Sequence, residues 1–309
     1  MPSRSVRIAT RASALALWQS NHVAQLIADS NPGCEVELVH VTTKGDRDQT
    51  GALRTFGGLG LFTREVQRVV LEGAADLAVH SLKDLPTESV DGLVLAGIPP
   101  RASVDDALVL PRGQTLASLD ELPQSATVGT GSPRRQAQLK FARPDLELRE
   151  IRGNVGTRIQ KLDDGEFDAV VLAAAGLERL DLADRISLRL TPPLVFPAVG
   201  QGALGLECRA DDTATQQILQ QISDVETRAV VSAERTLLRT LRAGCHAPLG
   251  VCCSLRENEL SMEGVLLDAA GTERINQTAC GSKSDPQAVG IALANALLKS
   301  GGQRLLDQE

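Results

Sequence analysis

One cysteine of this chain lies in a setting where a thiol could react. Cys245 occurs in the stretch LRAGCHAPLG, in which Gly244 and Pro248 indicate an exposed loop rather than a buried strand. Arg242 and His246 are close in sequence, and a neighbouring cation favours the thiolate form of a cysteine. From these residues alone, Cys245 could be a nucleophile, a metal ligand, the attachment point of a cofactor, or a small packed side chain.

Arginines gather in the stretch VGTGSPRRQ, where a strand is expected to end at Thr130. Ser132 suits the N-cap of the helix that follows, and Pro133 suits its first position. Arg134 and Arg135 then fall in the first helical turn, where the helix dipole disfavours a cation by a few tenths of a kcal/mol. The pair could be exposed and solvated, but two guanidinium groups beside free backbone N–H groups favour an anion-binding site.

Two other strand ends show the same pattern. In LREIRGNVGTR a strand leads through a glycine-containing turn to a helix, with Arg152 and Arg158 near the turn. Residues 134–158 hold seven Lys or Arg and three Asp or Glu, a difference of +4 in a chain of formal net charge −7. Near the N-terminus, Arg11 and the expected N-cap Ser13 follow another strand. Guanidinium groups suit carboxylates and phosphates alike, but no phosphate-loop or dinucleotide motif supports nucleotide binding.

A carboxylate that could take part in proton transfer follows the strand expected at Leu77–His80. In the stretch HSLKDLP, Lys83 and Asp84 lie in the loop before Pro86. A carboxylate at a strand end can act as an acid, as a base, or as a stabiliser of developing positive charge. A Lys–Asp pair on a surface turn is the simpler alternative, and the residues alone leave both open.

The composition is that of an ordinary globular protein. The chain has 309 residues, 42% hydrophobic and 23% charged, which predicts two or three domains. No apolar run approaches the ~20 residues that span a bilayer, and the start MPSRSVRIAT lacks the apolar region of a signal peptide, so a cytoplasmic location is expected. The negative net charge argues against nucleic acid or anionic membrane as partners. Without C-x-x-C spacing or clustered His, we expect free thiols and no metal site.

The elements that must position these residues follow two similar rhythms. Short apolar runs alternate with helical patterns over Val6–His80 and again over Thr127–Ala173, which implies two mainly parallel sheets with helices on both faces. We expect two similar doubly wound α/β lobes with a cleft between them, and ligands at the carboxyl ends of the strands. The expected boundaries are 1–100 with 200–221, 101–199, and 222–309 as a small C-terminal α+β domain that carries Cys245. The strand expected at Ala203–Glu207 would return to the first sheet.

Together the motifs resemble the porphobilinogen deaminase family over nearly the whole chain. In family order they are RIATRASALALWQ, TTKGD, GLFTRE, ADLAVHSLKDLPT, VGTGSPRRQAQL, IRGNVGTRIQKLDDGEFDAVVLAAAGLERL, PAVGQGALGLE and AGCHAPLG. The resemblance implies a transferase of haem and tetrapyrrole biosynthesis. Four units of the small-molecule substrate porphobilinogen are condensed head to tail, with loss of ammonia, onto a covalently tethered dipyrromethane. Hydrolysis then releases the linear tetrapyrrole hydroxymethylbilane, and a monomer is the family expectation.

The resemblance also assigns roles to residues. Cys245 matches the cysteine that holds the dipyrromethane cofactor through a thioether, so it is an anchor and not the nucleophile of turnover. Asp84 matches the carboxylate that stabilises the cationic azafulvene-like species left when ammonia departs. The other matches would bind the carboxylates of the cofactor or of the substrate. The cofactor-binding set is Ser81, Lys83, Asp84, Thr130, Ser132, Arg134, Arg135 and Arg158. The substrate-binding set is Arg11, Ser13, Arg152, Arg158, Arg179 and Gln201.

Two positions depart from the family pattern, and two other functions stay open. Leu59 stands where the family usually has Lys, in the loop Thr43–Gly60 that could form a mobile lid, and Gly131 replaces a commonly seen Ser. An anion receptor or effector-sensing module of the same periplasmic-binding-protein-like fold would need neither Asp84 nor Cys245, and a receptor would usually carry an export signal. A thiol-dependent transferase would use Cys245 as its nucleophile.

Overall fold

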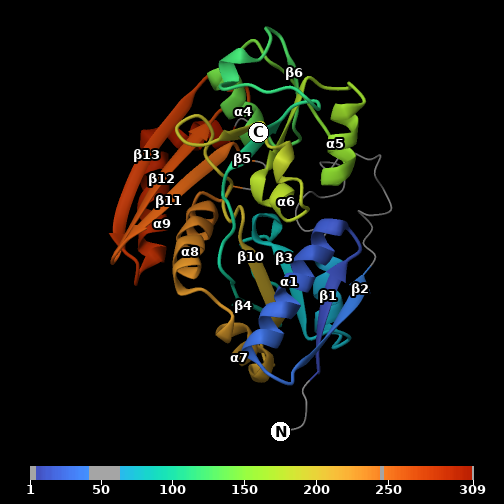
Figure 1. Ribbon diagram of the computed structural model, residues 1–309. Coiled ribbons are helices and arrows are strands. Elements are labelled where there is room, and N and C mark those ends of the chain that lie inside the picture. The colour runs from blue at the N-terminus through green and yellow to red at the C-terminus, as the bar shows by residue number, and fades with distance from the viewer. Residues whose placement is uncertain (1–4, 42–62, 244–246, 308–309) are drawn as a thin grey trace. The chain divides into compact units, whose positions relative to one another are not determined.

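The computed structural model describes residues 5–41, 63–243 and 247–307 (Figure 1). The chain divides into two compact units, the first formed by Met1–Ala102 with Gly202–Arg228 and the second by Ser103–Gln201 with Ala229–Glu309. The division expected from the sequence is finer, because it separates the C-terminal part from the second lobe. That three-part division stays a prediction.

The first unit is built on a five-stranded mixed sheet of strand order β2-β1-β3-β10-β4. Its strands are β1 (Ser5–Arg11), β2 (Glu35–Val41), β3 (Leu77–Ser81), β4 (Leu93–Gly97) and β10 (Leu204–Arg209). Strand β1 runs parallel to β2 and β3, whereas β10 runs antiparallel to both β3 and β4. The expected return of a late strand to the first sheet is therefore confirmed, since β10 lies between β3 and β4.

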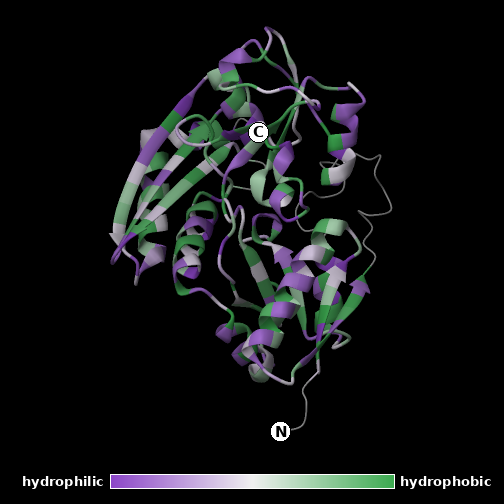
Figure 2. Cartoon of the chain, in the orientation of Figure 1, coloured by the Kyte–Doolittle hydropathy of each residue, from purple (hydrophilic) through white to green (hydrophobic). Residues whose placement is uncertain are grey.

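Helices cover both faces of this sheet. The helices are α1 (Ala14–Ser30), α3 (Arg64–Leu71) and α7 (Thr213–Gln221). Ile8 of β1 packs in one hydrophobic cluster with Val23 of α1 and Leu219 of α7, whereas Ala9 packs on the opposite face with Val66 of α3. A sheet buried on both faces needs apolar side chains in both directions. Accordingly, Figure 2 shows hydrophobic colour along much of the strands and mixed colour on α1.

The second unit holds a sheet with the same plan, of strand order β7-β6-β8-β5-β9. Its strands are β5 (Asp106–Val109), β6 (Thr127–Gly129), β7 (Glu147–Arg149), β8 (Ala169–Ala173) and β9 (Leu188–Leu190). Its helices are α4 (Pro133–Ala142), α5 (Val155–Asp163) and α6 (Ala174–Glu178). Leu139 of α4 packs on one face, while Leu162 of α5 and Leu177 of α6 pack on the other. Two similar doubly wound α/β sheets were expected, and this part of the predicted fold class is confirmed.

The C-terminal part of the second unit has the expected α+β character. Its elements are α8 (Val225–Thr240), whose residues 225–228 are counted with the first unit, β11 (Leu249–Arg256), β12 (Glu259–Leu267), β13 (Arg274–Ser282), α9 (Pro286–Leu297) and α10 (Gln303–Leu306). The three strands form an antiparallel sheet. Its core joins Leu237 of α8, Met262 of β12 and Leu293 of α9, all fully buried.

Short 3₁₀ or π turns complete the chain. They are η2 (Leu82–Asp84), η3 (Leu119–Glu121), η4 (Ala183–Arg185) and η5 (Leu298–Gly302). Among residues 5–41, 63–243 and 247–307, no helix combines the length and the apolar character that crossing a membrane requires.

Candidate active site

In the first unit, predicted site residues meet at one edge of the sheet. Strands β1 and β3 are parallel, with Ala9 paired to Ala78, so Arg11 and Ser81 both lie at strand carboxyl ends of that edge. Ser13 follows directly as the N-cap of α1, where its Oγ accepts a hydrogen bond from the backbone N–H of Ala16 at 3.4 Å. The N-cap expected from the sequence is therefore confirmed.

The Ser81 hydroxyl is oriented by a residue that sequence reasoning missed. Gln19, buried on α1, donates its Nε2–H to Ser81 Oγ at 2.8 Å. Because this bond occupies a lone pair of the hydroxyl oxygen, the Ser81 O–H proton can be donated to another group. A ligand carboxylate is one acceptor that suits it. The only sequence signal for Gln19 is a polar residue at a position where the apolar spacing of α1 points inward.

Lys83 and Asp84 lie in the turn η2, which two buried leucines fix in place. Leu82 is 1% exposed and Leu85 is 4% exposed, and the Leu85 N–H closes the turn on the Leu82 carbonyl at 3.2 Å. The Leu82 N–H in turn donates to the Ala203 carbonyl at 3.0 Å. Asp84 itself is exposed, and no hydrogen bond or ion pair of its carboxylate is found in the described parts of the chain. The turn therefore presents an uncommitted carboxylate.

The second unit places the other predicted residues at the carboxyl ends of the parallel strands β6, β7 and β8. Thr130 and Ser132 follow β6, and Ser132 occupies the N-cap position of α4 without a side-chain capping bond. Its backbone N–H donates instead to Thr130 Oγ1 at 3.3 Å. Arg152 lies in the turn between β7 and α5, and Arg158 on α5 donates its Nε–H to the Gly153 carbonyl at 2.8 Å.

Arg134 and Arg135 are buried, so an exposed and solvated pair is wrong. Both bind Asp106, the first residue of β5, which pairs with Ala173 at the carboxyl end of β8. Arg134 Nη1 donates to Asp106 Oδ2 at 2.7 Å, and Arg135 donates through Nε and Nη2 to Asp106 Oδ1 at 2.9 and 2.7 Å. Gln201, fully buried, adds its Nε2–H to the same Oδ1 at 3.0 Å. The two arginines predict an anion here, and the chain itself supplies one, the carboxylate of Asp106.

Asp106 and the two arginines form a buried cluster of net positive charge. Burial raises the pKa of the Asp106 carboxyl, but the two guanidinium groups outweigh it and hold that pKa well below its usual range. Burial lowers the pKa of Arg134, an effect that Asp106 opposes. One carboxylate facing two guanidinium groups leaves a formal surplus of +1.

This surplus fits the carboxylate-bearing dipyrromethane that the resemblance implies. The Arg134 Nε–H is buried and has no hydrogen-bond acceptor among the residues described. Burying a polar N–H without a partner is costly, and a bound carboxylate would supply both an acceptor and the balancing charge. The donor set therefore suits an anionic cofactor.

The other two predicted substrate-binding residues of the second unit are Arg179 and Gln201. Arg179, 8% exposed, follows α6, and burial lowers the pKa of its guanidinium against the nearby Glu178. Gln201 also donates to the Val104 carbonyl at 2.7 Å, so its amide is part of the Asp106 cluster. Sequence reasoning missed Asp106, whose only signal was its position, after Asp105, directly before the apolar run ALVL.

The predicted cofactor anchor lies outside the described residues. Cys245 belongs to 244–246, and the loop Thr43–Gly60, with Leu59, falls within 42–62. On either side of the anchor, Leu241 and Ala247 are buried in the same hydrophobic cluster.

The cysteines that the structure describes form no disulfide bond with one another: Cys34, Cys208, Cys252, Cys253 and Cys280. Burial raises the pKa of Cys208 to about 11, which makes it a poor nucleophile at neutral pH.

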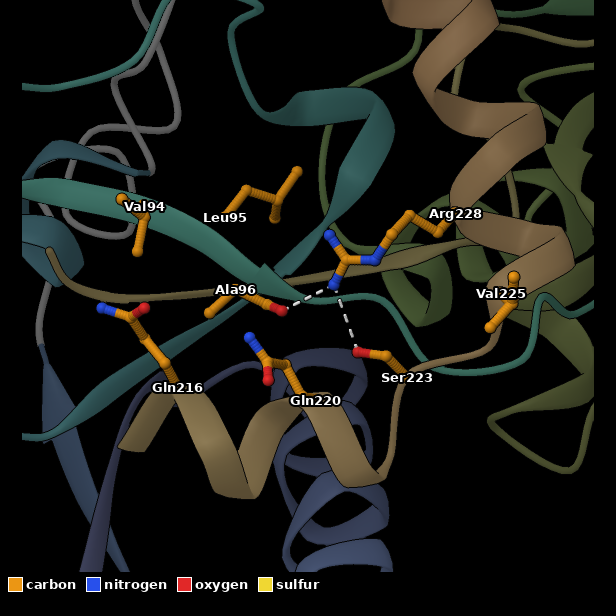
Figure 3. A pocket seen from close by; sticks show the side chains of 8 residues that line it. All are labelled: Val94, Leu95, Ala96, Gln216, Gln220, Ser223, Val225 and Arg228. Atoms are coloured by element: carbon orange, nitrogen blue, oxygen red, sulfur yellow. Dashed lines mark hydrogen bonds between the residues drawn. The ribbon is translucent and has the colours of Figure 1, made fainter. Parts of the chain in front are cut away.

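A cavity of about 390 Å³ lies on the first unit, and none of the predicted site residues lines it. Figure 3 shows its wall, formed by β4, α7 and Arg228. Arg228 Nη2 donates to the Ala96 carbonyl of the edge strand β4 at 2.6 Å and to Ser223 Oγ at 3.3 Å. The guanidinium therefore binds the strand edge to the turn after α7, and the geometry gives this cavity no part in the site.

Comparison with known proteins agrees with the motifs. The model "Porphobilinogen deaminase, dipyromethane cofactor binding domain" matches residues 6–217, and the C-terminal domain model of the same family matches residues 229–299. The chain is 45% identical over 306 residues to the porphobilinogen deaminase of Syntrophotalea carbinolica, covering 99% of this chain and 96% of that one.

Solved structures with a similar chain trace include periplasmic and effector-binding domains. The periplasmic VFT2 domain of Bordetella pertussis BvgS matches at a TM-score of 0.42 and 18% identity, over 74% of this chain and 92% of that one. The effector-binding domain of BenM matches at a TM-score of 0.43 and 14% identity, over 72% and 91%. The two family models and the full-length relative carry the assignment: this chain belongs to the porphobilinogen deaminase family.

Proposed function

We propose that this chain carries out its family's reaction with Asp84 as the carboxylate at the reacting centre and Cys245 as the cofactor anchor. Porphobilinogen units are condensed head to tail with loss of ammonia, and the linear tetrapyrrole hydroxymethylbilane is released by hydrolysis. The observation that carries the proposal is the setting of Asp84, an exposed carboxylate without a protein partner among the described residues, on a turn that buried leucines hold.

Asp84 stabilises positive charge as ammonia leaves the substrate. Loss of ammonia from the aminomethyl group produces a cationic azafulvene-like species, and a nearby carboxylate lowers the energy of that cation. The same oxygen atoms can accept a proton from the pyrrole carbon after the new bond has formed. A carboxylate already paired with a lysine or arginine would serve both steps less well, because part of its charge would be neutralised.

The arginine and hydroxyl groups bind carboxylates. Asp106 and Gln201 hold Arg134 and Arg135 in fixed positions, so these donors are oriented before any ligand binds. Ser81, with its hydroxyl proton directed away from Gln19, offers a further donor in the first unit. Arg11, Ser13, Lys83, Thr130, Ser132, Arg152, Arg158 and Arg179 complete the proposed binding set.

Cys245 holds the cofactor through a thioether. When bound, dipyrromethane supplies the terminal pyrrole carbon onto which substrate units are added. An anchor requires a thiol that is accessible, and the Gly- and Pro-containing sequence around Cys245 favours an exposed loop.

Intact-protein mass spectrometry tests the anchor. Protein made in a host that produces porphobilinogen should carry an adduct of two pyrrole units. Cys245→Ser should lack it, whereas Cys280→Ser, which changes an exposed thiol on β13, should keep it. An unmodified wild-type protein, or an adduct that persists in Cys245→Ser, would contradict the proposal.

We also propose that the chain acts as a cytoplasmic monomer without nucleic-acid or membrane partners. A formal net charge of −7 opposes binding to polyanions. Light scattering on the eluted holoenzyme should give a mass near the chain mass of 32.7 kDa, and a concentration-independent mass of twice that value would refute a monomer.

A further inference from the structure

Two buried titratable side chains near the Asp84 turn have no part in the reaction described above. His80 and Glu207 are 6% and 5% exposed, and His80 Nε2 lies 3.0 Å from Glu207 Oε2. The oxygen lies off the axis of the ring N–H, so this is a close polar contact rather than an aligned hydrogen bond. Gln67 of α3, 4% exposed, donates its Nε2–H to the same Glu207 oxygen at 2.7 Å. We call these three residues the buried polar cluster.

The register of β3 against β10 explains why these side chains meet. His80 pairs with Gly205, which has no side chain, and Glu207 pairs with Ala78 two residues earlier on β3. Residues two apart on a strand share a face, so His80 and Glu207 are diagonal neighbours on one side of the sheet. Helix α3 covers that side, and it contributes Gln67.

The cluster lies where β3 has fewest backbone partners. Strand β3 pairs with β1 only at Leu77 and Ala78, whereas its last residues, Val79–Ser81, pair with β10 alone among the described residues. The turn η2 starts directly after Ser81. Whatever fixes the end of β3 against β10 therefore fixes the starting point of the turn that carries Asp84.

A buried polar cluster can fix such a point better than apolar contacts can. If the strand moves, the close contact between His80 and Glu207 and the hydrogen bond from Gln67 to Glu207 are both strained, and a buried polar group that loses its contacts costs free energy that a shifted methyl group does not. We infer that His80 and Glu207 are positioning residues for Asp84, holding the end of β3 against β10 so that η2 presents its carboxylate in one place. The effect on turnover rests on the proposed function; the effect on the turn does not.

Hydrogen exchange on the holoenzyme tests the positioning directly. In His80→Gln and in Glu207→Gln, the amides of Leu82 and Leu85, whose hydrogen bonds define the turn, should exchange about tenfold faster. The kcat for ammonia release from porphobilinogen should fall by about 10- to 100-fold, since small displacements of a reacting group cost that much. KM should change less than kcat, because of the proposed binding residues only Ser81 and Lys83 lie on the segment that becomes less ordered.

Arg7→Gln is the matched control. Arg7 on β1 pairs with Asp76 at 2.9 Å, directly before the opposite end of the same strand β3. Its loss should lower the melting temperature, yet leave exchange at Leu82 and Leu85 and the kcat within about twofold of wild type.

The double variant His80→Gln/Glu207→Gln should be no slower than the worse single variant, because each change already breaks the contact. Unchanged exchange at the turn in both single variants, additive losses in the double variant, or an equal effect of Arg7→Gln would each overturn the inference. If Glu207→Gln does not fold, the result for His80→Gln alone tests the inference, because that variant keeps the hydrogen bond from Gln67 to Glu207. Faster exchange in a protein that releases no ammonia from porphobilinogen would refute the proposed function and support the positioning role.

Discussion

The two α/β sheets share one strand order but use their key carboxylates in opposite ways. In each sheet order, three neighbouring parallel strands come first. The fourth strand, β10 or β5, then runs antiparallel to both of its neighbours. Asp84 follows the third strand of the first sheet and is exposed. Asp106 begins the fourth strand of the second sheet and is 1% exposed, bound to Arg134 and Arg135. One plan therefore provides an accessible carboxylate in one sheet and a committed one in the other.

The helices that follow β1 and β6, the second strand in each sheet order, show the same contrast. Helix α1 starts with the capping hydroxyl of Ser13 and has no charged residue in its first turn. Helix α4 starts without a side-chain cap at Ser132 and carries two arginines in its first turn. The first turn of α4 is acceptable because Asp106 neutralises part of its charge. In the proposed function, the first sheet provides the reacting carboxylate and the second provides rigid donors for anions.

Asp84→Asn should give the largest effect on turnover, because it removes the charge while keeping the shape of the side chain. We expect kcat to fall by about 10²–10⁴-fold, the usual contribution of a carboxylate that stabilises charge or moves protons. The tethered cofactor should remain detectable by mass. Ammonia release per active site is the measurement, and Asp91→Asn, which changes another exposed carboxylate of the first unit, is the control. Near-normal turnover in Asp84→Asn would refute its role.

Asp106→Asn should mainly lower the free energy of unfolding. Removing this charge leaves two buried guanidinium groups without a counter-ion, and breaking a buried ion pair costs about 3–5 kcal/mol. Denaturation by urea measures the free energy of unfolding. The control is Asp105→Asn, whose partner Arg189 is 44% exposed and whose pair should contribute about 1 kcal/mol or less. Equal losses in the two variants would show that Asp106 is not the committed carboxylate described here.

The stability that Asp106 contributes should depend on pH in a defined direction. Its pKa in the folded chain lies below the ordinary value of 3.8, so the folded state binds a proton there less readily than the unfolded state does. The contribution is complete above pH 3.8 and is lost as the pH falls toward the native pKa. The stability difference between wild type and Asp106→Asn should therefore shrink on acidification below about pH 4. If the stability difference between wild type and Asp106→Asn grew as the pH fell below about 4, the predicted direction of the pH dependence would be wrong.

The parallel strands of both sheets could be predicted from the sequence, and the antiparallel strands that complete the second sheet could not. The strands at Thr127–Gly129 and Ala169–Ala173 lie where the buried apolar runs predict them. Strand β5, with only four residues, and β9, with three, have no alternation or length that would distinguish them from loops. Because Asp106 begins β5, missing that strand also meant missing the partner of both arginines.

The candidate site was predictable residue by residue but not in its contacts. Position at a strand end indicated Arg11, Asp84, Arg134 and Arg135, since those ends share an edge in a parallel sheet. Gln19 and Asp106 act through hydrogen bonds to residues 62 and 28 or 29 positions away, and spacing along the chain carries no signal for such pairs. The anchor Cys245, outside the described residues, stays a prediction.

Gly131→Ser should have the smallest effect, and it tests how closely the turn before α4 packs against the residues that follow β7. A Cβ at Gly131 would meet the Ile151 carbonyl at 3.4 Å and Glu150 Cγ at 3.8 Å, which is ordinary contact, and the backbone is outside the left-handed region. Removing a glycine from an unstrained position stabilises by about 0.4–1 kcal/mol through the unfolded chain. We expect a slightly higher melting temperature and a kcat within about twofold of wild type.

Gly153→Ser is the matched control for stability. Gly153 has φ +112°, and an added Cβ there would lie 2.7 Å from Thr157 Cγ2, so a side chain is both strained and crowded. This variant should melt below wild type, whereas Gly131→Ser should not. If Gly131→Ser lowered the melting temperature as much as Gly153→Ser, the turn before α4 would be tighter than its contacts indicate, and the missing hydroxyl at residue 131 would reflect a steric limit of this sheet edge.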